Sequence, residues 1–250
     1  MGISKVVKEL GNRSKAIYEY HRDKRLYNDL LTDGIFLIDD RDCIPIISDK
    51  YKEAGSIDIH YFLQDIYMAK KVMEFGEKDH YDIGSRVDGF ISHLLVSDSI
   101  KSVTMLDIRP LSVSIPKLNF IQTDATMLDG IPDNSIRSLS SLHAIEHFGL
   151  GRYGDPIDPD AWKKVLIAVQ KKLARGGRFF LSVPIGVKDK VCFNAHRIFS
   201  PETIVNSCTR LELRSFCYVH QYKVIESTCR DYLKTGGEFD CGMFIFDKSL

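Results

Sequence analysis

Two short apolar runs that each end in an acid constrain the fold of this chain most. Residues 80–89 read HYDIGSRVDG, in which the first run ends at Asp82 and a turn passes through Gly84 and Gly89. A helix-like segment follows, and a second run, VTMLDIRPL, ends at Asp107. A strand, a glycine turn, a helix and a second strand with a terminal carboxylate make up a nucleoside-binding βαβ unit. The glycines let the backbone approach the ligand, and the second acid accepts hydrogen bonds from ribose hydroxyls. The order therefore predicts a nucleoside-bearing cofactor.

The composition limits the classes of partner. The 250 residues carry 34 Lys and Arg and 34 Asp and Glu, so the formal net charge is zero. Without a basic field to hold phosphates, a general nucleic-acid binder is disfavoured. No apolar run has the length of a membrane span, and the opening residues MGISKVVKEL lack a signal-peptide core. The six scattered cysteines contain no C-x-x-C pair, which favours reduced thiols in a cytoplasmic protein over disulfides or a zinc site.

The hydrophobic pattern divides the chain into an extension and a core domain. Residues 3–31 have a loose helical rhythm and residues 33–55 are irregular, so we expect a helical and irregular extension over 1–55. Over 56–250 strands and helices alternate, which predicts a doubly wound, largely parallel α/β sheet. The expected strands cover 79–83, 102–107, 118–121, 136–142, 178–183, 212–220 and 240–247, and the expected helices lie near 56–75, 88–97, 159–174 and 201–209. The last two strands, with no helix expected between them, predict an antiparallel edge.

The glycine turn argues against two common phosphate-bearing cofactors. A dinucleotide site needs G-x-G-x-x-G, whereas residues 84–89 read GSRVDG and put Asp88 close to where a pyrophosphate would lie. No G-x-x-x-x-G-K-[ST] occurs, so a P-loop is excluded at the level of the motif. S-adenosylmethionine (SAM) carries a sulfonium cation and no phosphate, so carboxylates near the turn suit it. A third acid, Asp124 in FIQTDATML, follows a short strand and is placed to contact an adenine amino group.

Seven segments between about residues 57 and 200 carry a family resemblance. They are IDIHYFLQD (57–65), HYDIGSRVDGF (80–90), LDIRPL (106–111), DATML (124–128), SLSSLHAIEHFGLGRYGDPID (138–158), GGRFFLSVPIG (176–186) and FNAHRIF (193–199). In these segments the chain resembles the class I SAM-dependent methyltransferases, and more narrowly the bacterial methyltransferase-like family DUF268, which is often associated with surface-polysaccharide gene clusters. The resemblance implies a Rossmann-like, seven-stranded sheet in the order 3-2-1-4-5-7-6, with the last strand antiparallel.

The resemblance also implies which residues bind SAM across the carboxyl ends of the first strands. Asp82 and Gly84 would line its amino acid end, Asp107 would bind ribose, and Asp124 would bind adenine. The cofactor-binding residues implied in this way are Asp82, Gly84, Ser85, Arg86, Asp107, Ile108, Asp124, Ala125, Leu142 and His143. Arg86 departs from the pattern, because common methyltransferases carry a second glycine there. It either pairs with the SAM carboxylate or blocks the pocket.

Two segments after predicted strands carry candidates for general-base chemistry. In LHAIEHFG, His143 and His147 are candidate bases and Glu146 is a candidate orienting acid, since the ordinary histidine pKa near 6.5 suits proton transfer. The H-x-x-E-H spacing also occurs in zinc peptidases, but there it needs a long helix, so no metal is expected. The alternative is that these groups only satisfy the loop backbone and each other. His196 in FNAHRIF is a further candidate base, and its alternative role is to cap the helix that begins near Ser200.

The loops at the strand ends also hold candidate substrate ligands. They are Arg152, Tyr153 and Asp155 in RYGDPID, and Asn194 and Arg197 in FNAHRIF. Arg152 would hold a phosphate or carboxylate, and Asp155 would bind hydroxyls or a divalent ion. The alternative for Asp155 is the closure of a turn by its side chain.

These patterns lead to one main hypothesis and two alternatives. The main hypothesis is a SAM-dependent methyltransferase acting on a hydroxyl or amine of a small polar acceptor, a sugar or a phospho- or nucleotide-linked precursor of capsule or surface polysaccharide. The acceptor class rests on the resemblance alone. The first alternative is a non-catalytic SAM- or nucleoside-binding regulatory or scaffold protein, which Arg86 motivates. The second is a nicotinamide-dependent sugar-modifying enzyme. A homodimer is left open.

Overall fold

The chain forms two compact units, and each is described by itself. The computed structural model describes residues 3–32, 36–47 and 58–249. The units are Met1–Ile57 and Asp58–Leu250, and the predicted boundary between residues 55 and 56 lies outside the described residues. In the first unit α1 spans Ile3–Leu30, as the helical rhythm predicted, and a short 3-10 turn, η1, spans Asp40–Asp42. Among the helices of the described residues, none combines the length and the apolar character needed to cross a membrane.

The second unit alternates strands with helices, as predicted. Its helices are α2 (Ile59–Phe75), α3 (Ser92–Leu95), α4 (Ala161–Lys172), α5 (Pro201–Ser207) and α6 (Cys229–Thr235), with a π-helical turn η3 (Val87–Ile91) and a 3-10 turn η4 (Ile145–His147). Its strands are β1 (Asp79–Ile83), β2 (Ser102–Asp107), β3 (Leu118–Gln122), β4 (Ile136–Leu142), β5 (Leu173–Ile185), β6 (Lys190–Cys192), β7 (His196–Ile198), β8 (Glu212–His220), β9 (Lys223–Ser227) and β10 (Asp240–Asp247).

The main sheet is parallel in its centre and has eight strands in the order β3-β2-β1-β4-β5-β10-β8-β9. β10 runs antiparallel to both β5 and β8, so the predicted antiparallel last strand is confirmed. The predicted count of seven strands is wrong, and the order differs from the predicted one because β9 extends the sheet beyond β8. β6 and β7 pair separately as a small antiparallel hairpin.

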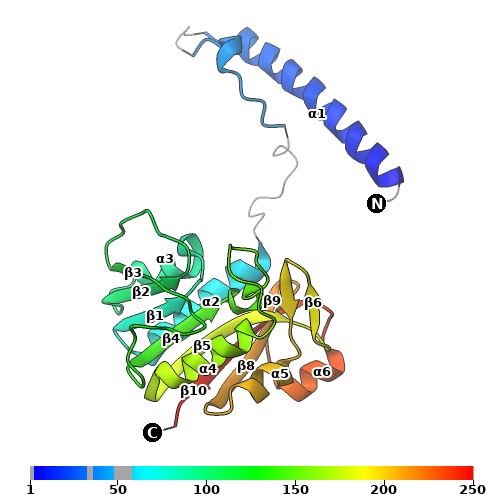
Figure 1. The fold of residues 1–250 in the computed structure, drawn as a ribbon. Helices are drawn as coiled ribbons and strands as arrows, with labels where there is room; N and C mark the ends of the chain where they lie inside the picture. Colours follow the sequence, from blue (N-terminus) through cyan, green and yellow to red (C-terminus); the bar gives the residue numbers. More distant parts are fainter. Residues whose placement is uncertain (1–2, 33–35, 48–57, 250) are drawn as a thin grey trace. The chain divides into compact units, whose positions relative to one another are not determined.

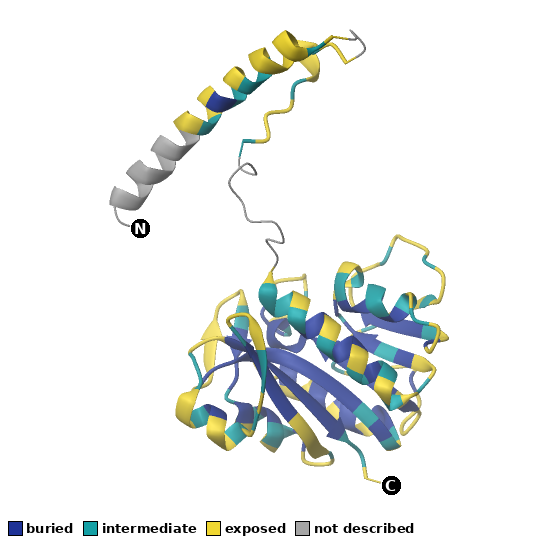
Figure 2. Cartoon of the chain, turned by 180° about the vertical axis from the view of Figure 1, so that it is seen from behind, coloured by how far each residue is buried: buried dark blue, intermediate teal, exposed yellow. Residues whose placement is uncertain are grey.

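Each face of the main sheet carries its own hydrophobic core, because successive strand residues point to opposite faces. On β5, Phe179 and Leu181 join the core under α4 and α5, whereas Phe180 joins the core under α2 and α3. Figure 1 shows the sheet between these two helical layers. Figure 2 shows that the central strands are buried and that the outer surfaces of the helices are exposed. This is the doubly wound arrangement that the alternating pattern predicted.

Two differences from the expected elements have local causes. The helix predicted to end at Gly176 and Gly177 ends at Lys172, and the chain enters β5 at once. Gly176 has a φ of +68° and the register between β4 and β5 shifts nearby, so the two glycines belong to an irregularity in the strand and not to a helix end. β9 was missed because its hairpin turns at Gln221 with a φ of +52°, without the Asn or Gly that usually marks such a turn.

Adjacent residues on α4 test the packing of this layer. Leu166 is 1% exposed and Ile167 is 63% exposed. We expect Leu166→Ala to lower the free energy of unfolding of the second unit by about 2–5 kcal/mol, because it leaves a cavity. The matched variant Ile167→Ala should change it by about 0.5 kcal/mol or less. Trp162, the single tryptophan, lies on the same helix and reports denaturant unfolding by fluorescence. Equal losses in the two variants would contradict this packing.

Candidate functional site

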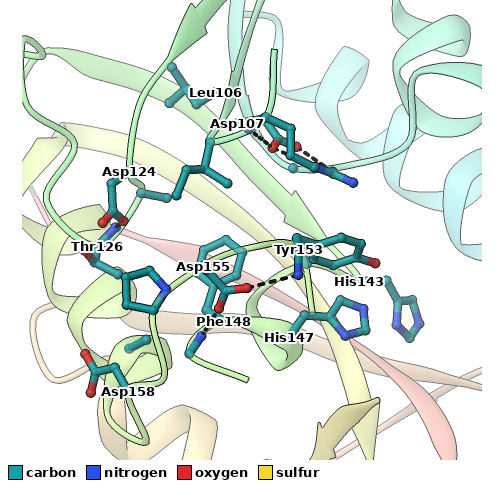
Figure 3. Close-up of a pocket in the computed structure, with 18 residues that line it drawn as sticks. Leu106, Asp107, Asp124, Thr126, His143, His147, Phe148, Tyr153, Asp155 and Asp158 are labelled. Carbon is teal, nitrogen blue, oxygen red and sulfur yellow. Dashed lines mark hydrogen bonds and ion pairs between the residues drawn. The ribbon is translucent and has the colours of Figure 1, made fainter. Parts of the chain in front are cut away.

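The carboxyl ends of the central parallel strands open onto a cavity. It holds about 810 Å³ of empty space, part of it open to solvent. Its lining includes eleven polar or backbone-exposing residues from four separate segments: Gly84, Asp107, Arg109, Asp124, Thr126, His143, His147, Gly149, Tyr153, Asp155 and Asp158. Figure 3 shows Asp107 and Asp124 toward one side of this cavity and His143 and His147 toward the other, with Tyr153 between Asp107 and His147.

The turn after β1 is shaped by the carboxylate of Asp82, which is fully buried. Asp82 accepts hydrogen bonds from the backbone N and the Oγ of Ser85, at 2.8 and 2.6 Å, and from the Oγ of Ser140 on β4. Burial raises the pKa of Asp82 to about 6. The next residue but one, Gly84, has a φ of +69°, and a Cβ there would lie 3.1 Å from the Cβ of Ala144. Asp82 therefore shapes the turn from behind and does not line the cavity.

The same network ties β1 firmly to β4. His80 makes hydrogen bonds from Nδ1 to the Oγ of Ser138 at 2.7 Å and from Nε2 to the Oγ of Ser140 at 2.8 Å. Burial lowers the pKa of His80 to about 3, so the ring is neutral near pH 7. The Oγ of Ser85 accepts a hydrogen bond from the backbone N of Leu142 at 3.0 Å. The predicted cofactor residues Ser85 and Leu142 are thus buried supports, one layer away from the cavity.

Arg86 lies on the surface and not in the cavity. Its guanidinium pairs with Asp88, with Nη2 at 2.9 Å from Oδ2, and lies 5.3 Å from the ring centre of Tyr61. Arg86 does not line the cavity, so the structure does not support the interpretation that it blocks the pocket. The ion pair with Asp88 also means that Arg86 would have to change partners to reach a SAM carboxylate.

Asp107, the acid at the end of β2, faces the cavity but is already paired. Arg109 donates its backbone N and Nε to Oδ1, at 2.8 and 3.0 Å, and its Nη2 to Oδ2 at 2.7 Å. The guanidinium of Arg109 also lies 4.4 Å from the ring centre of Tyr153. Arg109 therefore joins the predicted ribose ligand to the loop on the far side of the cavity. The sequence reasoning missed Arg109, although a basic residue two positions after an acid is a common local ion pair.

The predicted adenine end is more open. Asp124 accepts one hydrogen bond at Oδ1, from the backbone N of Thr126 at 2.8 Å, and is exposed. Ile108 is 38% exposed and lines the cavity together with Ala125. A carboxylate beside an exposed apolar side chain can accept hydrogen bonds from an aromatic base while the side chain packs on the face of that base.

His143 and Glu146 form a buried pair next to the end of β4. His143 has a φ of +49°, a conformation that its backbone N stabilises by donating to the backbone O of Ser182 at 3.0 Å. Its Nδ1 lies 2.7 Å from the Oε1 of Glu146. Burial lowers the pKa of His143, but the Cys241 thiol and the Glu146 carboxylate raise it more, so it lies well above its ordinary value. A protonated histidine cannot serve as a base, so His143 is better suited to donate a hydrogen bond.

Two atoms of this pair have no hydrogen-bond partner among the described residues: Nε2 of His143 and Oε2 of Glu146. The two side chains are only 6% and 1% exposed. Buried polar atoms are nearly always hydrogen-bonded in folded proteins, and exceptions concentrate at functional sites.

His147 has the geometry of a general base. Its Nδ1 lies 2.6 Å from the backbone O of Ala195, and because a carbonyl can only accept, Nδ1 carries the proton. The lone pair of the neutral ring is then at Nε2, which lies 3.7 Å from the Oε1 of Glu146. Burial lowers the pKa of His147 below its ordinary value, so the ring is neutral at pH 7. His147 lines the cavity, whereas Glu146 lies behind it.

His196 is half-buried and rests against Phe239, with ring centres 5.5 Å apart. It does not line this cavity. The suggested capping role is not seen, because the backbone N of Ser200 at the start of α5 donates instead to Asp189 at 2.8 Å. Burial lowers the pKa of His196.

The loop at 148–158 is held by two of the predicted substrate residues. Asp155 accepts hydrogen bonds from the backbone N atoms of Gly149 at 2.7 Å and Tyr153 at 3.1 Å, so it closes a turn, as its alternative role required. Arg197 is buried and donates Nη1 to the backbone O of Phe148 at 2.6 Å. We therefore correct Arg197 from a substrate ligand to a support of the loop, because its guanidinium is committed to backbone carbonyls.

The remaining predicted substrate residues are divided. Tyr153 lines the cavity, whereas Arg152 and Asn194 do not. Arg152 donates Nη1 to the backbone O of Ala195 at 2.8 Å, and Asn194 is exposed. Within the described residues, no group of three or more His, Cys, Asp and Glu side chains is arranged to hold a metal ion. The H-x-x-E-H segment forms the 3-10 turn η4 and not a long helix.

Comparison with family models gives one match. Residues 129–222 match the family described as "Caenorhabditis protein of unknown function, DUF268". The matched segment contains the His143 to His147 turn and the 148–158 loop. It names the same family as the resemblance, but the association with bacterial polysaccharide genes stays a prediction. A comparison with curated proteins finds none that matches.

Solved structures resemble the chain in fold at low sequence identity. A 1,6-didemethyltoxoflavin-N1-methyltransferase from Burkholderia thailandensis, solved with 1,6-didemethyltoxoflavin and S-adenosylhomocysteine, has a TM-score of 0.54 at 13% identity, covering 100% of this chain and 92% of its own. The N-methyltransferase NodS from Bradyrhizobium japonicum WM9, solved with S-adenosylhomocysteine, has a TM-score of 0.51 at 12% identity, covering 77% and 93%. The [4+2]-cyclase SpnF has a TM-score of 0.52 at 13% identity, covering 74% and 80%. The chain therefore has the Rossmann-like fold of class I SAM-dependent methyltransferases.

Proposed function

We propose that the chain is a SAM-dependent methyltransferase that acts on a hydroxyl or amine of a small polar acceptor. One observation carries the proposal. A neutral histidine with a free Nε2, His147, faces the same cavity as the strand-end acids Asp107 and Asp124. A base at one side and nucleoside ligands at the other are what methyl transfer from a nucleoside donor requires. The fold supports the proposal but does not by itself fix the chemistry, since it is shared with a [4+2]-cyclase.

The residues around the cavity fit the proposed cofactor. Gly84 has no Cβ, and one built there would come within 4.0 Å of the Oδ2 of Asp107, so its absence leaves room beside the proposed ribose ligand. Asp107 would hold the ribose hydroxyls, Asp124 the adenine amino group, and Ile108 the face of the base. When bound, SAM supplies an electrophilic methyl group on a sulfonium. The carboxylates suit its positive charge.

The protein's own contribution is alignment and removal of a proton. Nε2 of His147 would take the proton of the acceptor hydroxyl or amine, while the hydrogen bond from Nδ1 to Ala195 keeps the ring in the required tautomer. Glu146 lies 3.7 Å from Nε2 and would stabilise the imidazolium that forms. Holding both reactants in line accounts for the remaining catalysis.

The finer parts of the proposal extend the family resemblance. We propose a sugar or a phospho- or nucleotide-linked precursor in capsule or surface-polysaccharide biosynthesis as the acceptor. We also propose that residues 56–250 form the catalytic domain, that 1–55 form an extension, and that the enzyme acts in the cytoplasm.

A second candidate function is a protein that binds SAM or a nucleoside without transferring a methyl group. One observation favours it. Both oxygens of Asp107 are occupied by Arg109, so the ribose ligand is not free in this structure. Binding without turnover over a broad acceptor panel would favour this candidate.

Calorimetry with SAM, S-adenosylhomocysteine and NAD tests the cofactor. We expect both adenosyl ligands to bind and NAD not to bind. Asp107→Ala should weaken adenosyl binding by about tenfold or more, because hydrogen bonds to a charged group are worth about 1.5–3 kcal/mol. The exposed Asp98→Ala is the matched control and should bind like the wild type. Failure of folded wild-type protein to bind either adenosyl ligand would overturn the proposal.

Arg109→Ala tests whether Arg109 competes with the cofactor. The variant frees both oxygens of Asp107, so we expect S-adenosylhomocysteine to bind about threefold to tenfold more tightly in the same calorimetric assay. The gain is small because Arg109 is half-exposed and water screens its ion pair. Weaker binding in Arg109→Ala would mean instead that Arg109 contacts the cofactor.

His147→Gln tests the proposed base. With an acceptor identified by a screen for S-adenosylhomocysteine release, kcat should fall by about 10²–10⁴-fold, the usual contribution of general-base catalysis. The affinity for S-adenosylhomocysteine should stay within about twofold. His196→Gln, the other sequence candidate, should retain kcat at saturating acceptor. A full kcat in His147→Gln would show that the base is elsewhere.

A further inference from the structure

Four histidines from separate elements are linked by contacts beside the cavity. On α2, Tyr61 packs against His143, with ring centres 5.0 Å apart. Its neighbour His60 stacks on Phe239, just before β10, at 5.7 Å and an interplanar angle of 20°. Phe239 in turn contacts His196 on β7 at 5.5 Å. One side of the arrangement thus runs from His143 across α2 to His196.

The other side closes through a single backbone carbonyl. The O of Ala195, next to His196, accepts hydrogen bonds from the Nδ1 of His147 at 2.6 Å and from the Nη1 of Arg152 at 2.8 Å. His147 is joined back to His143 through Glu146. We call this closed set of contacts the histidine circuit, after His60, His143, His147 and His196.

The inner end of the circuit is prepared for a hydroxyl group. The Nε2 of protonated His143 is a buried donor without a partner, and the Oε2 of Glu146 is a buried acceptor without a partner. One hydroxyl can accept a hydrogen bond from the first and donate one to the second. The proposed base, His147, lies beside the same pair, so a hydroxyl there would be next to the group that removes its proton.

The outer end of the circuit favours an anion. Arg152 is exposed and uses one nitrogen for the Ala195 carbonyl, which leaves the rest of its guanidinium for a ligand. His196 and His60 are half-buried and can gain a proton when an anion approaches. Two nearby carboxylates are already satisfied: Asp155 by backbone N–H groups, and Asp240 by the hydroxyl of Tyr232 at 2.9 Å.

We propose that the histidine circuit binds the acceptor, and that the acceptor is a small hydroxylated oxyanion. Its hydroxyl would lie between His143 and Glu146, and its oxyanion would lie at Arg152 and His196. A carboxylate and a phosphate share this chemistry. The inference rests on the proposed function, and it assigns to His60 and Phe239 a place in the acceptor site.

The test uses the full chain saturated with S-adenosylhomocysteine and three probes: glucuronate, glucose 6-phosphate and glucose. Nitrogen NMR of the histidine side chains reports the site directly. We expect the two acids to bind at least tenfold more tightly than neutral glucose and to shift the signals of His60, His143, His147 and His196. The other four histidines, His21, His80, His93 and His220, are internal controls. Preference for one acid would identify the anion as carboxylate or phosphate.

Two variants make the test specific. Arg152→Gln removes the exposed cation and should weaken binding of the favoured acid at least tenfold, while glucose is unaffected. Arg230→Gln, a change of the same kind at an exposed position outside the circuit, should bind the acid like the wild type. His196→Gln gives a second measurement, with the histidine spectrum confirming that each variant is folded.

The outcomes separate this inference from the proposed function. If S-adenosylhomocysteine binds but glucose binds as well as the acids, or if the shifts fall on the four control histidines, the acceptor class proposed here is wrong and the methyltransferase proposal stands. If the acids bind at the circuit but no adenosyl ligand binds, the cofactor is wrong and the anion site remains.

Discussion

The arrangement of the candidate site depends on one buried carboxylate, that of Asp82. Its hydrogen bonds to Ser85 and Ser140 join the first strand to the fourth and fold the chain back at Gly84. An unsatisfied carboxylate in this position would be very costly, so the three donors and the ion are mutually dependent. Because β4 leads directly into His143 and His147, the same bonds that shape the cofactor turn also position the proposed base.

Much of the fold could be predicted from sequence because it depends on local signals. Apolar runs ending at Ile83, Asp107 and Leu142 marked strands whose bounds agree with the structure. The errors occurred where two local signals competed. Gly176 and Gly177 suit a helix end as well as a strand irregularity, and only the pairing of β5 with β4 decides between them. The turn at Gln221 carries no residue that favours a positive φ, so nothing in the sequence announced β9.

The site was less predictable, because the role of a polar residue depends on partners that are distant in sequence. Position after a strand correctly indicated that Asp107, Asp124 and His147 face the cavity. It could not show that Arg197 is committed to the carbonyl of Phe148. Nor could it separate His143 from His147, because the difference lies in which atom meets Glu146 and which meets Ala195. Phe239 had no motif at all, since its contacts with His60 and His196 exist only in the folded chain.

The long-range nature of the histidine circuit has a consequence for folding. α2 stands at the start of the second unit, and Phe239 precedes the strand that ends it. Contacts between such distant positions carry a large loop-closure entropy and form only after the intervening chain is ordered. β10 must insert between β5 and β8 before Phe239 can reach His60. The strand that completes the sheet therefore also completes the circuit, so a chain that has not finished folding cannot present it.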